Sequence, residues 1–298
     1  MKITDTGEIL GATIEGLDLA RPLSEDQFEA VVRTLGERGV VRFPAQRLTG
    51  RQLADFSARF GELEINVASS AYQEPGLPEV MILSNIVENG KAIGLADAGQ
   101  DWHTDMSYSR TIAFANVLYG IKIPRRGGRA LGATEFSNMH AAYDGLPAEM
   151  KRDLEGMTVL HDFNKFWEMM RNRDGSERAP LSDEQRQKRP ASVHPVFMSH
   201  PITGRTVLYC NPGYAMRINE LDPDDSERTL EALFEHQLQP RFQYVHQWSP
   251  GDVLMWDHIR TIHMAVADYG PDEHRLMLRC QVIADRVFDE SFRNALRA

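Results

Sequence analysis

Apolar residues recur at helical spacing in five stretches of the chain, and capping signals open three of them. Ser24 begins a capping box, Thr49 begins a second one, and Asp222 precedes a proline at the first helical position. Apolar side chains then follow at intervals of three and four residues, which gives each helix one face to bury. The predicted helices cover residues 24–36, 49–61, 138–146, 147–154 and 222–237.

Short runs rich in β-branched and aromatic residues lie between these helices and are bounded by glycine, proline or polar turn residues. From Phe242 to Trp248 every second residue is aromatic or histidine, which is the alternation of a strand with one buried face. The predicted strands cover residues 40–43, 80–83, 114–123, 157–160, 194–197, 207–209, 242–248, 253–256 and 276–282. So many short strands around helical insertions favour a mainly β protein with a jelly-roll core.

Residues 165–192 interrupt this pattern, because they are rich in charge and poor in β-branched residues. We expect them to form an insertion within a single domain that spans residues 1–298. Two interpretations of the insertion stay open: a lid over a functional site, or a solvated surface loop with no role.

Composition narrows the classes of partner. The 298 residues carry a formal net charge of −10, which argues against nucleic acid or an anionic membrane. An anionic substrate would therefore need arginines placed close to it, since the field of the whole protein repels it. The sequence has two cysteines, no apolar run that could span a membrane and no signal-peptide pattern at its start. We expect a cytoplasmic protein.

The segment His103-Thr104-Asp105 carries the strongest chemical signal. On a strand, residues i and i+2 point to the same side, so His103 and Asp105 can bind one ion while Thr104 points away. His263, about 160 residues later, supplies a second imidazole. Two histidines and one carboxylate can occupy one face of an octahedral metal and leave the other face open for a cosubstrate and dioxygen. This is the ligand pattern of non-haem Fe(II) oxygenases.

Arg275 directly precedes the last predicted strand and Arg279 lies within it, and this segment is otherwise apolar. Guanidinium groups are costly to bury without anions. Carboxylates of the protein itself, for instance Asp257 or Asp285, are one explanation. The neighbouring metal ligands favour bound organic acids instead, at least for Arg275.

Several segments together resemble the family of Fe(II)/2-oxoglutarate-dependent oxygenases that contains taurine dioxygenase and 2,4-dichlorophenoxyacetate dioxygenase. These proteins have a double-stranded β-helix, or cupin-like, fold. The resemblance extends over nearly the whole chain, and its segments are residues 39–44, 102–105, 138–143, 194–196, 256–263 and 275–279.

The resemblance implies roles for individual residues. His103, Asp105 and His263 would be the iron ligands. Arg275 would pair with the distal carboxylate of 2-oxoglutarate, a bidentate task suited to guanidinium geometry, and Thr134 would hydrogen-bond the same carboxylate. Arg279 would reach the other end of the cosubstrate and an acidic group of the substrate.

Four aromatic residues are candidates for contact with the substrate: Trp102, Tyr108, Phe163 and Tyr214. For Trp102, packing beside the metal-binding segment is the favoured alternative. His161 is a further candidate for the pocket wall. His258 lies five residues before His263, so we expect these two side chains on opposite faces of a strand and expect no metal ligation by His258.

The implied activity is hydroxylation of a small anionic substrate such as a carboxylate, a sulfonate or an aryloxy acid. Dioxygen and 2-oxoglutarate are consumed, and succinate and carbon dioxide are released. If the hydroxylated carbon also bears an ether oxygen, an amine or a sulfonate, the product collapses and that bond breaks. Members of the family often form dimers or tetramers, so we expect a homo-oligomer.

Two other functions stay open at this point. A Zn(II) hydrolase could use the same three ligands with an open coordination position, and it would need neither Arg275 nor 2-oxoglutarate. A non-catalytic β-barrel module could bind a metal or a ligand without forming succinate.

Overall fold

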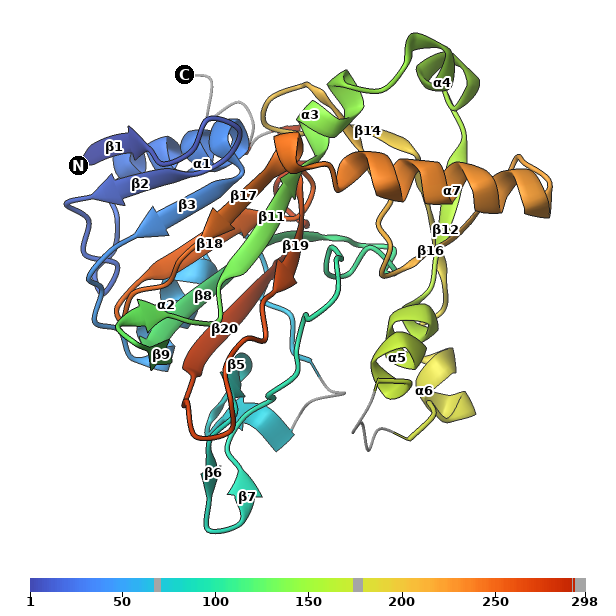
Figure 1. The fold of residues 1–298 in the computed structure, drawn as a ribbon. Helices are drawn as coiled ribbons and strands as arrows, with labels where there is room; N and C mark the ends of the chain where they lie inside the picture. Colours follow the sequence, from blue (N-terminus) through green and yellow to red (C-terminus); the bar gives the residue numbers. More distant parts are fainter. Residues whose placement is uncertain (67–70, 174–178, 291, 293–298) are drawn as a thin grey trace.

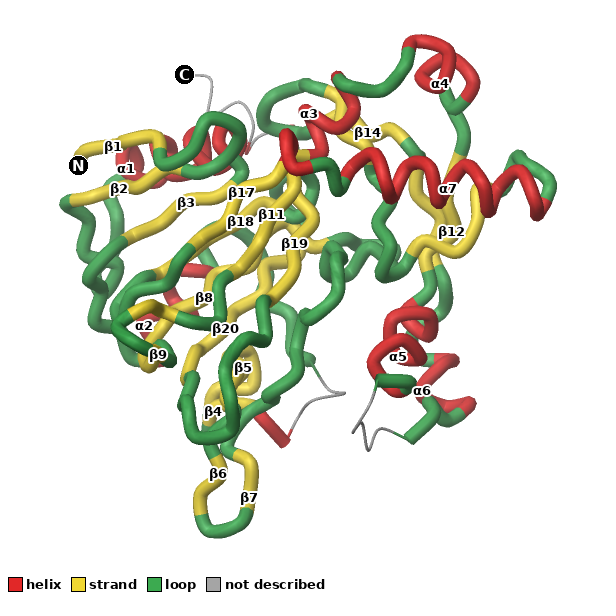
Figure 2. Tube along the Cα trace, viewed as in Figure 1, coloured by secondary structure: helices red, strands yellow, loops and turns green. Residues whose placement is uncertain are grey.

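The computed structural model describes residues 1–66, 71–173, 179–290 and 292, and two facing β-sheets form its main part (Figures 1 and 2). The larger sheet contains, in spatial order, β1 (Lys2–Asp5), β2 (Ala12–Glu15), β3 (Val40–Phe43), β18 (Val253–Asp257), β8 (Ala113–Lys122), β20 (Leu276–Ile283), β5 (Leu77–Ser84) and β4 (Gln73–Glu74). The smaller sheet contains β17 (Gln243–His246), β11 (Thr134–Asn138) and β19 (Thr261–Ala265).

Alternating side chains of the larger sheet enter two different cores, because successive residues of a strand point to opposite faces. On β3, Val41 and Phe43 belong to the largest hydrophobic cluster, whereas Val40 belongs to a second one. Helices α1 (Glu25–Arg38) and α2 (Gly50–Ser57) cover the first face. Both begin with the capping boxes predicted from the sequence, so that prediction is confirmed.

The opposite face of the larger sheet looks towards the smaller sheet. There Phe136 of β11 packs with Trp256 of β18 in an edge-to-face contact, with ring centroids 5.5 Å apart. Within the smaller sheet, Phe136 pairs with His263 on one side and with Tyr244 on the other. This register aims alternate residues of β11 and β19 into the space between the sheets.

The chain between β11 and β17 forms a second group of elements (Figure 1). Its helices are α3 (Met139–Asp144), α4 (Ala148–Asp153), α5 (Phe163–Arg171), α6 (Asp183–Gln187) and α7 (Pro223–Gln237), followed by a 3-10 turn at Pro240–Phe242. Its strands are β12 (Thr158–His161), β13 (Ser192–Pro195), β14 (Phe197–Ser199), β15 (Thr206–Leu208) and β16 (Ala215–Ile218). The remaining short strands are β6 (Val87–Glu88), β7 (Lys91–Ala92), β9 (Arg125–Arg126) and β10 (Arg129–Ala130).

The predicted fold class is confirmed in its coarse form, as a mixed arrangement of helices and strands around a large sheet. The predicted strand at residues 194–197 needs correction, because it is divided between two sheets. The chain changes partner at Val196, whose N–H donates to the carbonyl of Met157, so β13 pairs with β12 and only β14 pairs with β15. No helix in the described part of the chain has the length and apolar character needed to cross a membrane.

The 165–192 insertion is not a plain loop, because it contains most of α5 and all of α6. Helix α5 buries Phe163, Phe166 and Met170 along one face, and Asp162 caps its N-terminus by accepting the N–H of Asn164. Residues 174–178 of the insertion lie outside the described residues. The described part covers one side of the site discussed next.

Candidate metal centre and cosubstrate cavity

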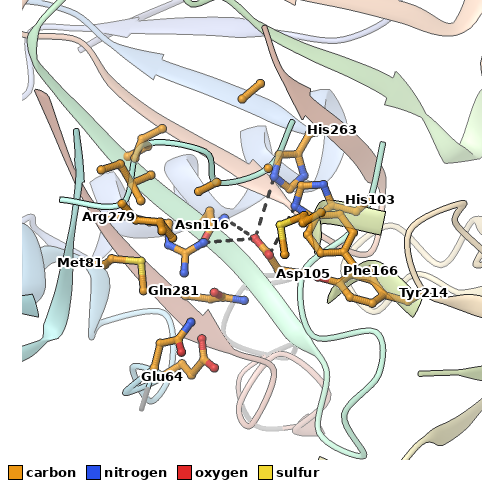
Figure 3. A pocket seen from close by; sticks show the side chains of 18 of the residues that line it. Glu64, Met81, His103, Asp105, Asn116, Phe166, Tyr214, His263, Arg279 and Gln281 are labelled. Carbon is orange, nitrogen blue, oxygen red and sulfur yellow. Dashed lines mark hydrogen bonds and ion pairs between the residues drawn. The ribbon is translucent and has the colours of Figure 1, made fainter. Parts of the chain in front are cut away.

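Three potential metal ligands, His103, Asp105 and His263, meet in the space between the two sheets (Figure 3). One donor atom from each residue lies within 4.8 Å of the other two. His103 Nε2 is 3.5 Å from Asp105 Oδ1, and His263 Nε2 is 3.9 Å from Asp105 Oδ2. The grouping predicted from the sequence is therefore present in the structure.

The backbone joins the two histidines directly. The N–H of each donates to the carbonyl oxygen of the other, at 3.0 and 2.8 Å, which places their ring centroids 4.2 Å apart. The prediction that His103 and Asp105 share a strand is wrong. The chain leaves the bridge after His103, and Asp105 lies in a turn where Met106 has a φ of 56°. The turn, not the period of a strand, brings the carboxylate back to the imidazoles.

Thr104 connects this turn to the segment that leads to His263. Its hydroxyl is 3.0 Å from the carbonyl oxygen of His258 and 2.6 Å from that of Thr261. The side chain points away from the ligands, as predicted, and it is buried. One hydroxyl therefore holds together the two remote segments that carry the three ligands.

The ring of His103 is fixed from two further sides. Its Nδ1–H donates to the carbonyl oxygen of Asp101 at 2.7 Å, which turns Nε2 towards Asp105, where it can ligate a metal once it has lost its own proton. Phe166 lies against the ring, with centroids 5.0 Å apart. A Cβ atom added at Gly213 would lie 2.8 Å from the Cβ of His103, so only glycine permits this approach of the backbone.

Neighbouring side chains hold Asp105 through its other oxygen, Oδ2. Asn116 donates its Nδ2–H to this atom at 2.8 Å, and Arg279 Nη1 lies 3.7 Å away. Burial alone would raise the pKa of Asp105, but the hydrogen bond and charge of His103, with the charge of Arg279, hold that pKa well below its usual value. Asp105 is therefore ionised at neutral pH.

The predicted orientation of His258 is wrong. Residues 258–260 form a turn, because the carboxylate of Asp257 accepts the N–H groups of Ile259 and Arg260. Strand alternation does not apply across a turn, so His258 Nε2 comes within 3.6 Å of the triad carboxylate. The donor atoms that converge are those of His103, Asp105 and His263, and the absence of metal ligation by His258 stays a prediction.

A cavity of about 960 Å³, which includes its mouth, opens beside the triad. Strands of both sheets and helix α5 contribute to its wall. The predicted residues that line it are His103, Asp105, Tyr108, Thr134, Phe163, Tyr214, His263, Arg275 and Arg279. Two predicted candidates lie outside the lining: Trp102 packs against the main core, and His161 packs between His194 and Tyr209.

Arg275 is a buried cation without an acidic partner. Only 7% of its surface is exposed, its Nε has no hydrogen-bond partner, and among the described residues no carboxylate pairs with it. Asp257 is engaged with His200 and backbone N–H groups, and Asp285 accepts from the N–H of Glu62. Neither of these carboxylates therefore neutralises the buried charge of Arg275. An anionic ligand bound in the cavity would neutralise it.

Thr134 faces the same cavity with a defined hydroxyl. Trp248 donates its Nε1–H to Thr134 Oγ1 at 3.0 Å. Because an indole N–H can only donate, the hydroxyl oxygen is the acceptor in this bond, and its own hydrogen is free to point elsewhere. Thr134 can therefore donate a hydrogen bond to an anion in the cavity.

Sequence reasoning missed several residues of the site. Asn116, Gln281 and Glu64 line the cavity, and Arg189 lines it from the insertion. Asn116 and Gln281 are paired across β8 and β20, so a buried polar residue within an apolar strand was the signal that could have revealed them. Arg189 carries no comparable local signal.

The residues present fit a divalent metal with an organic diacid. Burial, together with the charge of His103, holds the pKa of His263 well below its usual value, so this imidazole is neutral and can ligate. With Asp105 ionised, the donor set is two imidazoles and one carboxylate, which suits Fe(II) and leaves coordination positions open. A Zn(II) hydrolase would explain the triad but not the buried Arg275, which has no carboxylate partner among the described residues.

Comparison with known proteins agrees with this fit. The sequence profile of the Taurine catabolism dioxygenase TauD, TfdA family matches residues 2–281. Pentalenolactone F synthase of Streptomyces avermitilis is 30% identical over 290 residues, which cover 94% of this chain and 92% of the relative. The alpha-ketoglutarate-dependent 2,4-dichlorophenoxyacetate dioxygenase of Cupriavidus pinatubonensis is 28% identical over 292 residues, with 94% and 96% covered.

Solved structures give the same result. The crystal structure of a taurine dioxygenase from Burkholderia xenovorans superimposes with a TM-score of 0.76 at 29% identity and covers 95% of this chain and 91% of that one. The structure of AAD-2 in complex with Mn(II) and N-oxalylglycine has a TM-score of 0.80 at 26% identity, with 96% and 99% covered. The chain belongs to the TauD, TfdA family and is an Fe(II)- and 2-oxoglutarate-dependent dioxygenase.

Proposed function

We propose that this chain hydroxylates a C–H bond of a small organic acid. The substrate, dioxygen and 2-oxoglutarate give the hydroxylated product, succinate and carbon dioxide, with one oxygen atom in the product and one in succinate. The single observation that carries the proposal is the buried guanidinium of Arg275, which has no carboxylate partner among the described residues and lines the cavity that also holds the triad. Named relatives act on 2,4-dichlorophenoxyacetate, (S)-phenoxypropionate or sulfonates, which supports an anionic substrate here.

His103, Asp105 and His263 are the residues that would hold Fe(II), and with 2-oxoglutarate the metal would supply the chemistry that activates dioxygen. Asn116 donates to one oxygen of Asp105 and so restricts rotation of the carboxylate. Supporting hydrogen bonds of this kind fix the direction of a ligand before the metal arrives. The hydrogen bonding of the Thr104 hydroxyl likewise fixes the backbone of the turn that carries Asp105.

Arg275 and Thr134 would bind the distal carboxylate of the cosubstrate. A guanidinium matches a carboxylate through two parallel N–H donors, and the hydroxyl held by Trp248 adds a third. Burial makes this pairing stronger than it would be in water. Arg279, 3.7 Å from Asp105, would serve the end of 2-oxoglutarate nearest the metal and can also reach an acidic group of the substrate.

The aromatic side chains of the cavity wall would exclude water and orient the substrate. Tyr108 and Tyr214 lie with ring centroids 4.8 Å apart, and Tyr214 lies 6.2 Å from the ring of His103. Burial raises the pKa of Tyr108 well above its usual value, so its hydroxyl stays protonated and can only take part as a neutral group. These rings would hold the body of the substrate beside the metal.

Five finer predictions from the sequence belong to the same proposal. The two facing sheets support a double-stranded β-helix core, and the shared hydrophobic core supports a single domain over residues 1–298. The position of α5 on the cavity wall favours the lid over a loop without a role. Homo-oligomerisation and a cytoplasmic location stay predictions from the sequence.

The test is aerobic incubation of the protein with Fe(II), 2-oxoglutarate and individual aryloxy acids, carboxylates and sulfonates. We expect at least one acid to give succinate and an oxidised product in equal amounts, and His263→Ala to give neither above background. Succinate that never rises above the substrate-free rate, together with hydrolysis supported by Zn(II), would instead support the hydrolase.

A further inference from the structure

Three polar side chains form a row across the larger sheet, and the row begins beside Asp105. Its first member is Asn116 of β8, and Gln281 of β20 lies directly opposite Asn116 in the antiparallel register. On the other side of Gln281, the N–H of Glu64 donates to the Gln281 carbonyl oxygen at 2.8 Å. Residues that lie directly opposite each other carry their side chains on the same face, with Cβ atoms about 5 Å apart. All three side chains line the cavity, and Figure 3 shows Gln281 between Asn116 and Glu64.

The two amides of this row are buried, and each has a polar atom without a hydrogen-bond partner among the described residues. Asn116 is 1% exposed and donates its Nδ2–H to Asp105, while its Oδ1 accepts no hydrogen bond. Gln281 is 4% exposed, and its Nε2 donates no hydrogen bond. The row therefore presents one acceptor and one donor, from neighbouring strands, at the wall of the cavity.

Packing gives no reason for an amide at position 281. The neighbours of Gln281 on β20, Cys280 and Val282, point to the other face of the sheet and belong to the largest hydrophobic cluster. On the face that Gln281 shares, Met277 is buried in the second cluster without any polar group. Methionine has about the length of glutamine, and an amide that is buried without partners is costly. A ligand that supplies the missing hydrogen bonds would offset this cost.

The charged groups near the row face one another. Arg279 Nη1 lies 3.7 Å from Asp105 Oδ2. Burial raises the pKa of Glu64, and the charges of Arg279 and Arg189 oppose that rise. A further charge bound at the amides would meet charges of both signs in the same wall, whereas an uncharged group would not. The amides are therefore suited to an uncharged ligand group.

We propose that Gln281, together with Asn116, is a specificity-determining residue that binds a hydroxyl or carboxamide group of the substrate. Either group can accept a hydrogen bond from Gln281 Nε2 and donate one to Asn116 Oδ1, whereas an ether oxygen can only accept and a methyl group does neither. The inference rests on the proposed function and deepens it, because it adds a second recognised group to the small organic acid.

The test measures binding rather than turnover. Protein loaded with Mn(II) and N-oxalylglycine, an analogue of 2-oxoglutarate, is titrated in a calorimeter with hydroxyl, carbamoyl and methyl derivatives of phenylacetate, each substituted at the ortho, meta or para position. The methyl derivatives add size without a hydrogen bond. Gln281→Met is compared with wild type. Gln237→Met is the matched control, because the Gln237 amide is also buried without partners among the described residues but does not line this cavity.

We expect wild type to bind the hydroxyl or the carbamoyl derivative of at least one ring position about tenfold more tightly than the methyl derivative of the same position. The derivative with the larger gain identifies hydroxyl or carboxamide as the preferred group. Gln281→Met should lose this preference and bind the methyl derivatives like wild type, and Gln237→Met should keep it. The Tm of Gln281→Met should equal or exceed that of wild type, because the variant no longer buries an amide without partners.

Four results would overturn the inference: wild type without this preference, a preference that survives in Gln281→Met, an equal loss of affinity for the methyl derivatives, or a Gln281→Met protein that unfolds below wild type. The last two would show a structural role instead. Failure of N-oxalylglycine itself to bind in the loading step would refute the proposed function, and the two failures are therefore distinguishable.

Discussion

Replacing Arg275 with methionine should change stability and ligand binding in opposite directions. In the ligand-free protein this guanidinium is buried and has no carboxylate partner among the described residues, and burial lowers its pKa. Methionine has a similar length and needs no counter-charge. Removal of a buried charge that lacks a partner relieves its desolvation cost, whereas removal of one member of a pair leaves the other uncompensated.

The expected magnitudes follow from these contacts. Apolar replacement of buried charged groups often stabilises by about 1–3 kcal/mol, which for a domain of this size raises Tm by about 2 °C per kcal/mol. The loss of two charged hydrogen bonds, about 1.5 kcal/mol each, weakens 2-oxoglutarate binding about 100-fold. Saturating 2-oxoglutarate with Mn(II) should therefore raise the Tm of wild type above that of the variant, which reverses their order.

Differential scanning calorimetry with and without the ligands measures both effects. Arg42→Met is the matched control, because Arg42 pairs with the buried carboxylate of Asp252 at 2.8 Å and its loss should destabilise by at least about 1 kcal/mol. An Arg275→Met protein that is destabilised like Arg42→Met and still binds 2-oxoglutarate normally would refute the reasoning.

Three further changes test the supporting contacts. Asn116→Ala should weaken Mn(II) binding about 10- to 100-fold, because Asp105 loses its hydrogen bond at Oδ2, and unchanged affinity in a metal titration would contradict this. Thr104→Val should lower the metal affinity, and it should lower the free energy of unfolding by about 1–3 kcal/mol, whereas Thr104→Ser should keep both at the wild-type value. If the two variants behaved alike in denaturant and metal titrations, the hydroxyl of Thr104 would not be what connects the two segments. Burial, with the charge of His194, lowers the pKa of His161 from 6.5 to about 3, so only the unfolded chain binds a proton between these values and stability falls as the pH decreases through them. Denaturation at several pH values between 6.5 and about 3 should show that the free energy of unfolding of His161→Phe decreases less than that of wild type. An identical pH dependence of the two proteins would show that His161 does not cause the loss of stability at low pH.

The sequence revealed the ligands of the site better than it revealed the local structure that positions them. His103, Asp105 and His263 were identified by residue type and by resemblance, and they do converge. The assumed strand through Asp105 failed because the hydroxyl of Thr104 bonds to carbonyls about 155 residues away, and this tertiary contact accompanies a turn. Local alternation carries no information about such a contact.

The supporting residues were hidden for a similar reason. Asn116 lies in a strand whose other residues are mostly apolar, so the sequence around it gives no sign of a function. Its role depends on the hydrogen bond that it donates to Asp105, which only the folded structure shows. Arg189 sits in a charged insertion, where nothing in the local pattern separates it from its solvated neighbours. By contrast, the helices at Ser24, Thr49 and Asp222 were predictable, because their caps are made by side chains within the same few residues.

The most direct measurement is an anaerobic titration of the metal-free protein with Fe(II) and 2-oxoglutarate, followed by visible absorption. The account predicts a weak metal-to-ligand charge-transfer band that saturates at one equivalent of each. His263→Ala should abolish the band, and Arg275→Met should shift its half-saturation to about 100-fold higher 2-oxoglutarate. No band in wild type, with Zn(II) bound tightly instead, would contradict the central claim that this cavity binds Fe(II) and 2-oxoglutarate together.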